Sequence, residues 1–117
     1  MNAEVTETRG FHIDARYPTA KAFIYLTDVS SLDDGPYTYV KNTIATYKPG
    51  DINSVLAKRF QWEDTEMPIV PLADIVPVLG KAGTLIISDQ SGMHRGLPQG
   101  LGRKRVALVG KYLLTDF

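Results

Sequence analysis

The sequence predicts a mainly antiparallel β fold. Short runs rich in β-branched and aromatic residues are separated by turn-forming residues roughly every 8–12 positions, which is typical of a sandwich or a barrel. Strands do not alternate with long helices, so a parallel α/β sheet is not indicated. The 117 residues contain no internal repeat and no linker, and we therefore expect residues 1–117 to form a single domain.

The first half of the chain contains the clearest strand signal. Residues 21–29 (KAFIYLTDV) lack Gly and Pro and are rich in β-branched and aromatic residues, so they predict a strand. The turn-forming segment SSLDDGP follows, and residues 37–40 (YTYV) are expected to return as the second strand of a hairpin. After a break at residues 41–43, residues 44–47 are expected to extend this second strand.

The middle of the chain, residues 49–71, has a weaker pattern and is expected to be an excursion between strands. Within it, residues 54–62 (SVLAKRFQW) predict a short helix. Asp51 or Asn53 is the expected N-cap, because a short polar side chain can accept a hydrogen bond from a free N–H of the first turn. Residues 63–68 are expected to form a loop.

The C-terminal third returns to strand patterns. Residues 73–79 (ADIVPVL) predict a strand, and Pro77 places it at a sheet edge or a bulge because proline has no N–H to donate. Residues 84–88 (TLIIS) predict a short buried strand. The Gly-rich residues 91–102 are expected to form a loop, and residues 105–114 to form the last strand.

Composition excludes several classes of function. Thirteen Lys and Arg residues balance thirteen Asp and Glu, so the formal net charge is zero and binding of nucleic acid through bulk positive charge is not indicated. The absence of Cys excludes disulfides and thiolate chemistry. No apolar run approaches the ~20 residues that span a bilayer, and the polar N-terminus carries no secretory signal. We therefore expect a cytoplasmic protein that binds neither nucleic acid nor a membrane, with its oligomeric state open.

Both histidines of the chain are candidate metal ligands. His12 and Asp14 are two positions apart, and in an extended segment such residues point to the same face. If the fold brings His94 opposite His12, two imidazoles and one carboxylate occupy one face of an octahedron, which suits non-haem Fe(II) oxygenases. The plainer alternative is a strand-end His12 that bonds Asp14 and a loop His94 that has no role.

An arginine near the last strand is a candidate anion ligand. Arg105 begins the predicted strand, eleven positions after His94, and shares a face with the apolar residues Ala107 and Val109. A guanidinium at this position could bind a carboxylate through two parallel hydrogen bonds. The alternative is a solvated charge within the basic cluster RKR.

Four stretches, in order, give the chain a family resemblance. Over most of residues 11–114 it resembles the phytanoyl-CoA dioxygenase family of Fe(II)- and 2-oxoglutarate-dependent oxygenases. The matching stretches are FHIDARY with the H-x-D motif, KAFIYLTDVSSLDDGPYTYV with a strand–turn–strand unit, GKAGTLIISDQSGMHRG with the second histidine, and RKRVALVGKYL with the last strand.

The resemblance implies a double-stranded β-helix, which is a cupin-like jelly roll of eight core strands in two sheets. Family members have a long segment before the H-x-D motif, so this chain would lack the N-terminal helices and the first core strand. Residues 3–11 would supply the second strand, and the missing strand would leave an open edge beside Arg105. Residues 41–44 (KNTI) depart from the Pro-Gly-Ser-His segment that is frequent in the family.

The resemblance also implies site residues and cofactors. His12, Asp14 and His94 would bind Fe(II). Arg105 would bind the far carboxylate of the cosubstrate 2-oxoglutarate, with Arg103 as the alternative because two positions along a strand keep the same facing.

The implied activity is the hydroxylation of a small organic substrate by O2, with succinate and CO2 as co-products. Arg16, Tyr17 and Arg95 are candidate substrate contacts, and Asp89 and Ser91 are candidates for orienting the histidines. Two alternatives stay open: a cupin-like metal- or ligand-binding β-barrel without turnover, and an inactive fragment of such an oxygenase.

Overall fold

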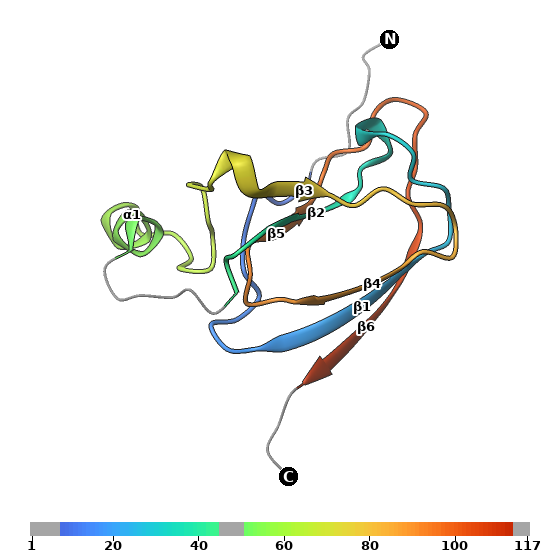
Figure 1. Ribbon diagram of the computed structural model, residues 1–117. Helices are drawn as coiled ribbons and strands as arrows, with labels where there is room; N and C mark the ends of the chain where they lie inside the picture. The colour runs from blue at the N-terminus through green and yellow to red at the C-terminus, as the bar shows by residue number, and fades with distance from the viewer. Residues whose placement is uncertain (1–7, 45–50, 114–117) are drawn as a thin grey trace.

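The protein is mainly β, with two antiparallel sheets that face each other. The computed structural model describes residues 8–44 and 51–113 (Figure 1). One sheet has the order β4-β1-β6 and the other the order β3-β2-β5. The strands of the first sheet are β1 (Thr19–Tyr25), β4 (Leu85–Asp89) and β6 (Ala107–Leu113), and those of the second are β2 (Tyr37–Val40), β3 (Ile75–Pro77) and β5 (His94–Gly96).

Strand β1 forms the centre of the first sheet, as its apolar composition favours. It pairs with β4 on one side and with β6 on the other. Beyond Tyr25 the ladder continues by one bond, from Leu26 N to Val106 O at 2.7 Å. Val29 then forms an isolated bridge with Gly80, so the strand predicted over residues 21–29 starts earlier and ends sooner than expected.

The prediction that residues 21–29 and 37–40 pair as a hairpin is wrong. Strands β1 and β2 belong to different sheets, and β2 pairs with β3 and β5 instead. The connection contains a short 3-10 helix, η1 (Leu32–Asp34), and carries the chain from one sheet to the other. Ile44 lies in a turn, and the rest of the extension predicted over 44–47 falls outside the described residues.

Strand β3 lies at an edge of its sheet, where Pro77 was expected. It pairs with β2 alone among the described residues, with Pro77 opposite Thr38. The strand is shorter than the predicted 73–79 because a second 3-10 helix, η2 (Leu72–Asp74), precedes it.

The loop predicted over residues 91–102 contains a strand that the sequence did not indicate. β5 has only three residues, with His94 opposite Tyr39 and Gly96 opposite Tyr37. Three residues rich in polar and small side chains have little intrinsic β preference. Pairing with β2 on one side and with His12 on the other makes this segment extended.

The excursion contains helix α1 (Ile52–Phe60), at one side of the sheets (Figure 1). Asp51 is its N-cap, with its carboxylate accepting a hydrogen bond from Ser54 N at 2.8 Å. Asn53, the other candidate, is buried, and its amide bonds both the N–H and the carbonyl of Ile69. Asn53 therefore anchors the chain that leaves the helix rather than capping it.

The space between the sheets holds a small aromatic core. Phe23, Tyr25, Val29 and Tyr37 are buried together, and the rings of Phe23 and Tyr37 have centroids 4.6 Å apart. The Tyr25 hydroxyl donates to Val78 O and accepts from Tyr37 N, which ties β1 to the second sheet. In the described part of the chain no helix has the length and apolar character needed to cross a membrane.

Candidate metal centre

Two backbone segments place His12 directly opposite His94. His12 N donates to His94 O at 3.1 Å and His94 N donates to His12 O at 2.9 Å, so the two residues form a bridge. On its other side, the His12 segment bridges to Glu66. Opposed residues in such a bridge share a face, and the two imidazole centroids are 4.5 Å apart.

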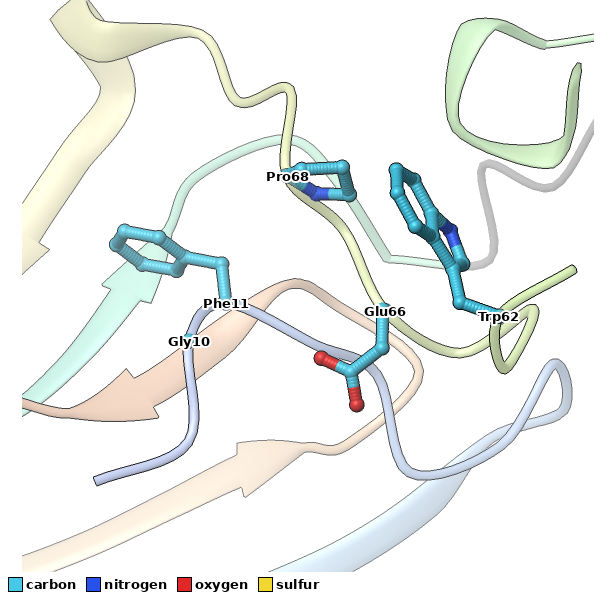
Figure 2. A pocket seen from close by; sticks show the side chains of 5 residues that line it. All are labelled: Gly10, Phe11, Trp62, Glu66 and Pro68. Atoms are coloured by element: carbon cyan, nitrogen blue, oxygen red, sulfur yellow. The ribbon is translucent and has the colours of Figure 1, made fainter. Parts of the chain in front are cut away.

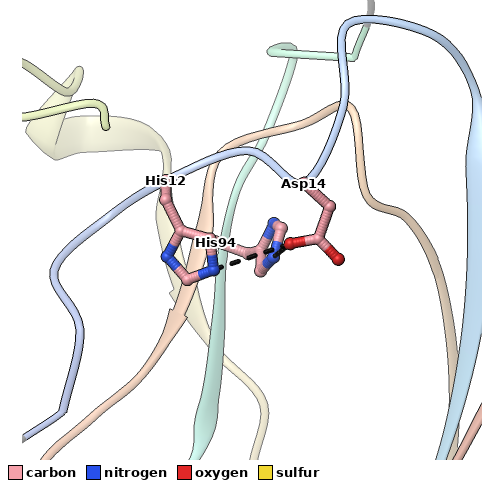
Figure 3. A group of neighbouring side chains, drawn as sticks. All are labelled: His12, Asp14 and His94. Carbon is pink, nitrogen blue, oxygen red and sulfur yellow. Dashed lines mark hydrogen bonds and ion pairs between the residues drawn. The ribbon is translucent and has the colours of Figure 1, made fainter. Parts of the chain in front are cut away.

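Asp14 completes the group on the same face, as its i+2 spacing from His12 predicts. Its backbone N donates to Gln90 O at 2.9 Å, which fixes the segment beside the turn before β5. Asp14 Oδ1 lies 3.1 Å from His94 Nε2 and 3.6 Å from His12 Nε2 (Figure 3). The intervening Ile13 points to the other face and is buried.

The histidine rings are held by backbone carbonyls. His12 Nδ1 lies 2.8 Å from Gly10 O, and His94 Nδ1 lies 2.8 Å from Gly92 O. A carbonyl oxygen only accepts, so each Nδ1 is the donor and each Nε2 faces Asp14. A hydrogen bond that fixes the distal nitrogen in this way is the usual arrangement around a metal-binding histidine.

The carboxylate of Asp89 is bonded away from these rings. Asp89 Oδ1 accepts hydrogen bonds from Ser91 N and Thr19 N, so its carboxylate stabilises the turn between β4 and β5. The sequence pointed to side chains for a role that two backbone carbonyls fill.

The electrostatic surroundings favour the protonation states that bind metal. Burial lowers the pKa of His12 below its ordinary value, and the neighbouring His94 and Arg9 lower it further. Burial alone would raise the pKa of Asp14. The hydrogen bond and the positive charge of Lys21, together with the interaction with His94, outweigh burial and hold that pKa below its ordinary value. A neutral imidazole and an ionised carboxylate are the ligand forms.

The three side chains together could hold a metal ion. Each offers one ligand atom, and these atoms all lie within 4.8 Å of one another. The centre is largely shielded, since the side chains of His12, Asp14 and His94 are 14, 16 and 5% exposed. Two nitrogens and one carboxylate oxygen suit Zn²⁺ as well as Fe²⁺, so the donor set leaves the metal's identity open.

Lys21 is a contact of the centre that the sequence did not single out. Its Nζ lies 2.7 Å from Asp14 Oδ2, on the carboxylate oxygen that does not face the histidines. A signal was present, because Lys21 alternates with Phe23 and Tyr25 and so shares their inward face. A lone lysine on the inward face of an apolar strand indicates a partner inside the fold.

Aromatic side chains of β2 enclose His94. The Tyr39 ring lies nearly parallel to the imidazole, with centroids 6.5 Å apart, and the Tyr37 ring centroid is 5.9 Å away. The Tyr39 hydroxyl donates to Asp89 O and lies over Gly92, where an added Cβ would collide with it. The turn that delivers His94 therefore depends on a glycine at this position.

The two candidate arginines have different surroundings. Arg103 Nη1 lies 3.2 Å from Asp34 Oδ1, and half of its side chain is exposed. Arg105 lies beside Gly96, where a Cβ would approach Nη2 to 3.1 Å. Its Nε is buried and has no hydrogen-bond partner among the residues that the structure describes. Gly96 is two positions from His94 on β5, so the guanidinium lies on the face of that strand to which His94 points.

One of the candidate substrate contacts joins two loops, and a second is exposed at the surface. Arg16 Nη2 donates to Asp64 O at 2.6 Å and Nε lies 3.7 Å from Asp64 Oδ2, so Arg16 joins the segment after Asp14 to the loop after α1. The side chain of Tyr17 is exposed.

Arg95 lies on the opposite face of β5 from His94, because neighbouring residues of a strand alternate in direction. Its guanidinium contacts Thr8 Oγ1 and lies over the Phe11 ring, 5.6 Å from the centroid. Phe11 also lines an open, mainly apolar pocket with Trp62 and Pro68 (Figure 2). Phe11 and His12 are adjacent in an extended segment, so this pocket and the metal centre lie on different faces.

Comparison with protein-family models, with curated proteins and with solved structures finds no match for the chain.

Proposed function

We propose that this protein is an Fe(II)- and 2-oxoglutarate-dependent dioxygenase that hydroxylates a small organic substrate and releases succinate and CO2. The convergence of His12, Asp14 and His94, with both Nε2 atoms facing the carboxylate, carries this proposal. Two imidazoles and one carboxylate on one face leave the opposite positions for a cosubstrate and O2. When bound, the iron supplies the activation of O2 that couples cosubstrate decarboxylation to hydroxylation.

Arg105 supports the cosubstrate assignment. Its buried Nε has no hydrogen-bond partner among the described residues, and the lack of a side chain at Gly96 lets the guanidinium lie close against β5. A buried donor without an acceptor is unfavourable, so a carboxylate there would gain a charge-assisted hydrogen bond. Arg105 would hold the far carboxylate of 2-oxoglutarate and keep it in one orientation, while Arg103 stays bonded to Asp34.

The path of the chain supports a jelly roll related to the phytanoyl-CoA dioxygenase family. Strand β1 lies in one sheet, β2 and β3 in the other, and β4, β5 and β6 then alternate between the two. Bridging of the His12 segment to β5 adds backbone pairing beside the second sheet. Crossing between two antiparallel sheets in this way is what a double-sheet jelly roll requires.

The test is binding of Fe(II) and 2-oxoglutarate under anaerobic conditions, followed by succinate release in air. We expect His94→Ala and Asp14→Asn to abolish Fe(II) binding, because each removes one of three ligands. Asp33→Asn, which removes an exposed carboxylate elsewhere, is the matched control. Fe(II)-dependent succinate release that is lost with either ligand would support the proposal.

Two other results would overturn it. Metal binding without 2-oxoglutarate binding would leave a cupin-like metal-binding barrel. Fe(II) affinity that is unchanged in His12→Ala or His94→Ala would remove the metal centre itself.

A further inference from the structure

The Asp14 carboxylate has two oxygens with different partners. Oδ1 faces the histidines, 3.1 Å from His94 Nε2, whereas Oδ2 receives Lys21 Nζ at 2.7 Å. Both side chains of this ion pair are largely shielded, with Lys21 25% and Asp14 16% exposed. A shielded, charge-assisted hydrogen bond of this length holds a carboxylate in one orientation.

The placement of Lys21 is unfavourable in the absence of that partner. It points inward from β1 between Thr19 and Phe23, both buried. Lys111 lies directly opposite it on β6, and like charges at directly opposed positions of a sheet repel. The contact with Asp14 offsets both costs.

We infer that Lys21 is a positioning residue that keeps Asp14 a one-oxygen ligand of the metal, an inference that rests on the proposed metal centre. With Oδ2 bonded to Lys21, only Oδ1 is directed at the ion, and the protein supplies three ligand atoms. A carboxylate without such a partner can rotate and bind through both oxygens. That second oxygen would occupy a coordination position that the cosubstrate needs.

Mn(II) is a suitable probe, because it takes the same donors and its bound waters can be counted from the broadening of its EPR lines in ¹⁷O-water. For the wild-type protein we expect about three bound waters on a six-coordinate ion. Lys21→Met keeps the length of the side chain and removes its charge, and we expect one water fewer. We also expect the affinity of the Mn(II)-loaded variant for 2-oxoglutarate to fall by at least about 10-fold.

Two further variants separate positioning from charge and from folding. Lys21→Arg retains a cationic donor and should restore the wild-type number of waters. Lys111→Met removes a charge from the same face of the sheet, directly opposite Lys21, and should leave that number unchanged. Thermal unfolding of each variant identifies any that does not fold. If Lys21→Met does not fold, fewer than about three bound waters in the wild-type protein or in Lys21→Arg would overturn the inference.

The inference and the proposed function fail in different ways. Wild-type protein that binds no Mn(II) in a titration would overturn the metal centre before any variant is compared. Wild-type protein that binds Mn(II) with the same number of waters as Lys21→Met would overturn the role of Lys21 alone. A loss of water in Lys111→Met equal to that in Lys21→Met would also overturn it, because charge and not contact would then be responsible.

Discussion

Arg103 and Arg105 show how strongly the surroundings of single residues differ within one short segment. Both belong to the same basic cluster, but Arg103 bonds Asp34 at the surface, whereas Arg105 lies inside, beside Gly96. The sequence placed Ala107 and Val109 on the face of Arg105. They lie opposite Tyr25 and Phe23 and so share the face of these buried residues, although Val109 is 51% exposed. The alternation of side chains along a strand thus predicted that residues 105, 107 and 109 share one face, although β6 itself begins only at Ala107.

This difference predicts unequal effects on cosubstrate binding. Arg105→Ala should weaken 2-oxoglutarate binding by about 10- to 100-fold, because it removes a charge-assisted pair from a shielded site. Arg103→Ala is the matched control and should change the affinity by less than about threefold, a surface effect. Calorimetric titration of the metal-loaded proteins measures both, and a larger effect of Arg103→Ala would move the carboxylate site to that residue.

At the scale of elements, the segments that the sequence predicted best are those with local causes. The strand β1 follows from its β-branched and aromatic residues, and the helix α1 begins after Asp51, one of the two N-caps that the sequence offered. The strand β5 and the crossover between β1 and β2 were not predicted, because both depend on partners distant in sequence. A short window of sequence does not show which distant strand a segment will pair with, or how the loop between the two strands will close.

The crossover is held by Asp34 at the end of η1. Asp34 Oδ2 accepts hydrogen bonds from the backbone N–H groups of Ser30 and Ser31 and from the Ser30 hydroxyl, and Oδ1 faces Arg103. The pKa of Asp34 is lowered below its ordinary value, chiefly by the hydrogen bond from Ser30 N. The hydrogen bonds from Ser31 N and the Ser30 hydroxyl and the charge of Arg103 lower it further, although burial opposes this shift.

A carboxylate whose pKa is lowered by folding stabilises the folded state at pH values above its pKa in the unfolded chain, which is about 3.9. This contribution is lost as the pH falls through the lower pKa of the folded state. Asp34→Asn should therefore lower the Tm at pH 7 and reduce the fall in Tm between pH 5 and pH 2. Calorimetric or circular dichroism melting at each pH provides the measurement, and equal pH profiles for the two proteins would contradict this assignment.

At the scale of the whole molecule, the first sheet has an apolar outer face. Residues of β1 that alternate with the buried ones are Ala20, Ala22 and Ile24, and their partners on β4 and β6 are largely apolar too. Four large side chains of this face are more than half exposed: Leu85 at 56%, Ile87 at 70%, Leu108 at 61% and Tyr112 at 59%. An apolar face favours association between chains, as do the edges of this sheet, which are unpaired within the described part of the chain.

Charge placed on this face should therefore oppose self-association. We expect Ile87→Lys to raise the protein concentration at which aggregates form, with a change in stability within about 0.5 kcal/mol because the site is so exposed. Val55→Lys introduces the same charge at an exposed apolar position of α1 and is the control. Light scattering against concentration distinguishes the two, and an equal effect of both variants would implicate net charge rather than the sheet face.

The sequence by itself determined the β character of the protein and the common facing of two of the three candidate ligands. Alternation put His12 and Asp14 on one face, because side-chain direction in an extended segment has a period of two. It also put Val109 on the face of Arg105, and the missing N–H of Pro77 predicted the edge position of its strand.

Only the tertiary structure decided which of these residues meet. Asp14 reaches His94 across 80 positions of sequence, and the bridge between His12 and β5 sets that distance. The partner of Lys21, the position of Arg105 beside Gly96 and the carbonyls that orient the histidines depend on the same long-range pairing. A periodic pattern fixes the direction of a side chain relative to its own backbone, whereas distances between side chains are fixed when strands from different parts of the chain pair.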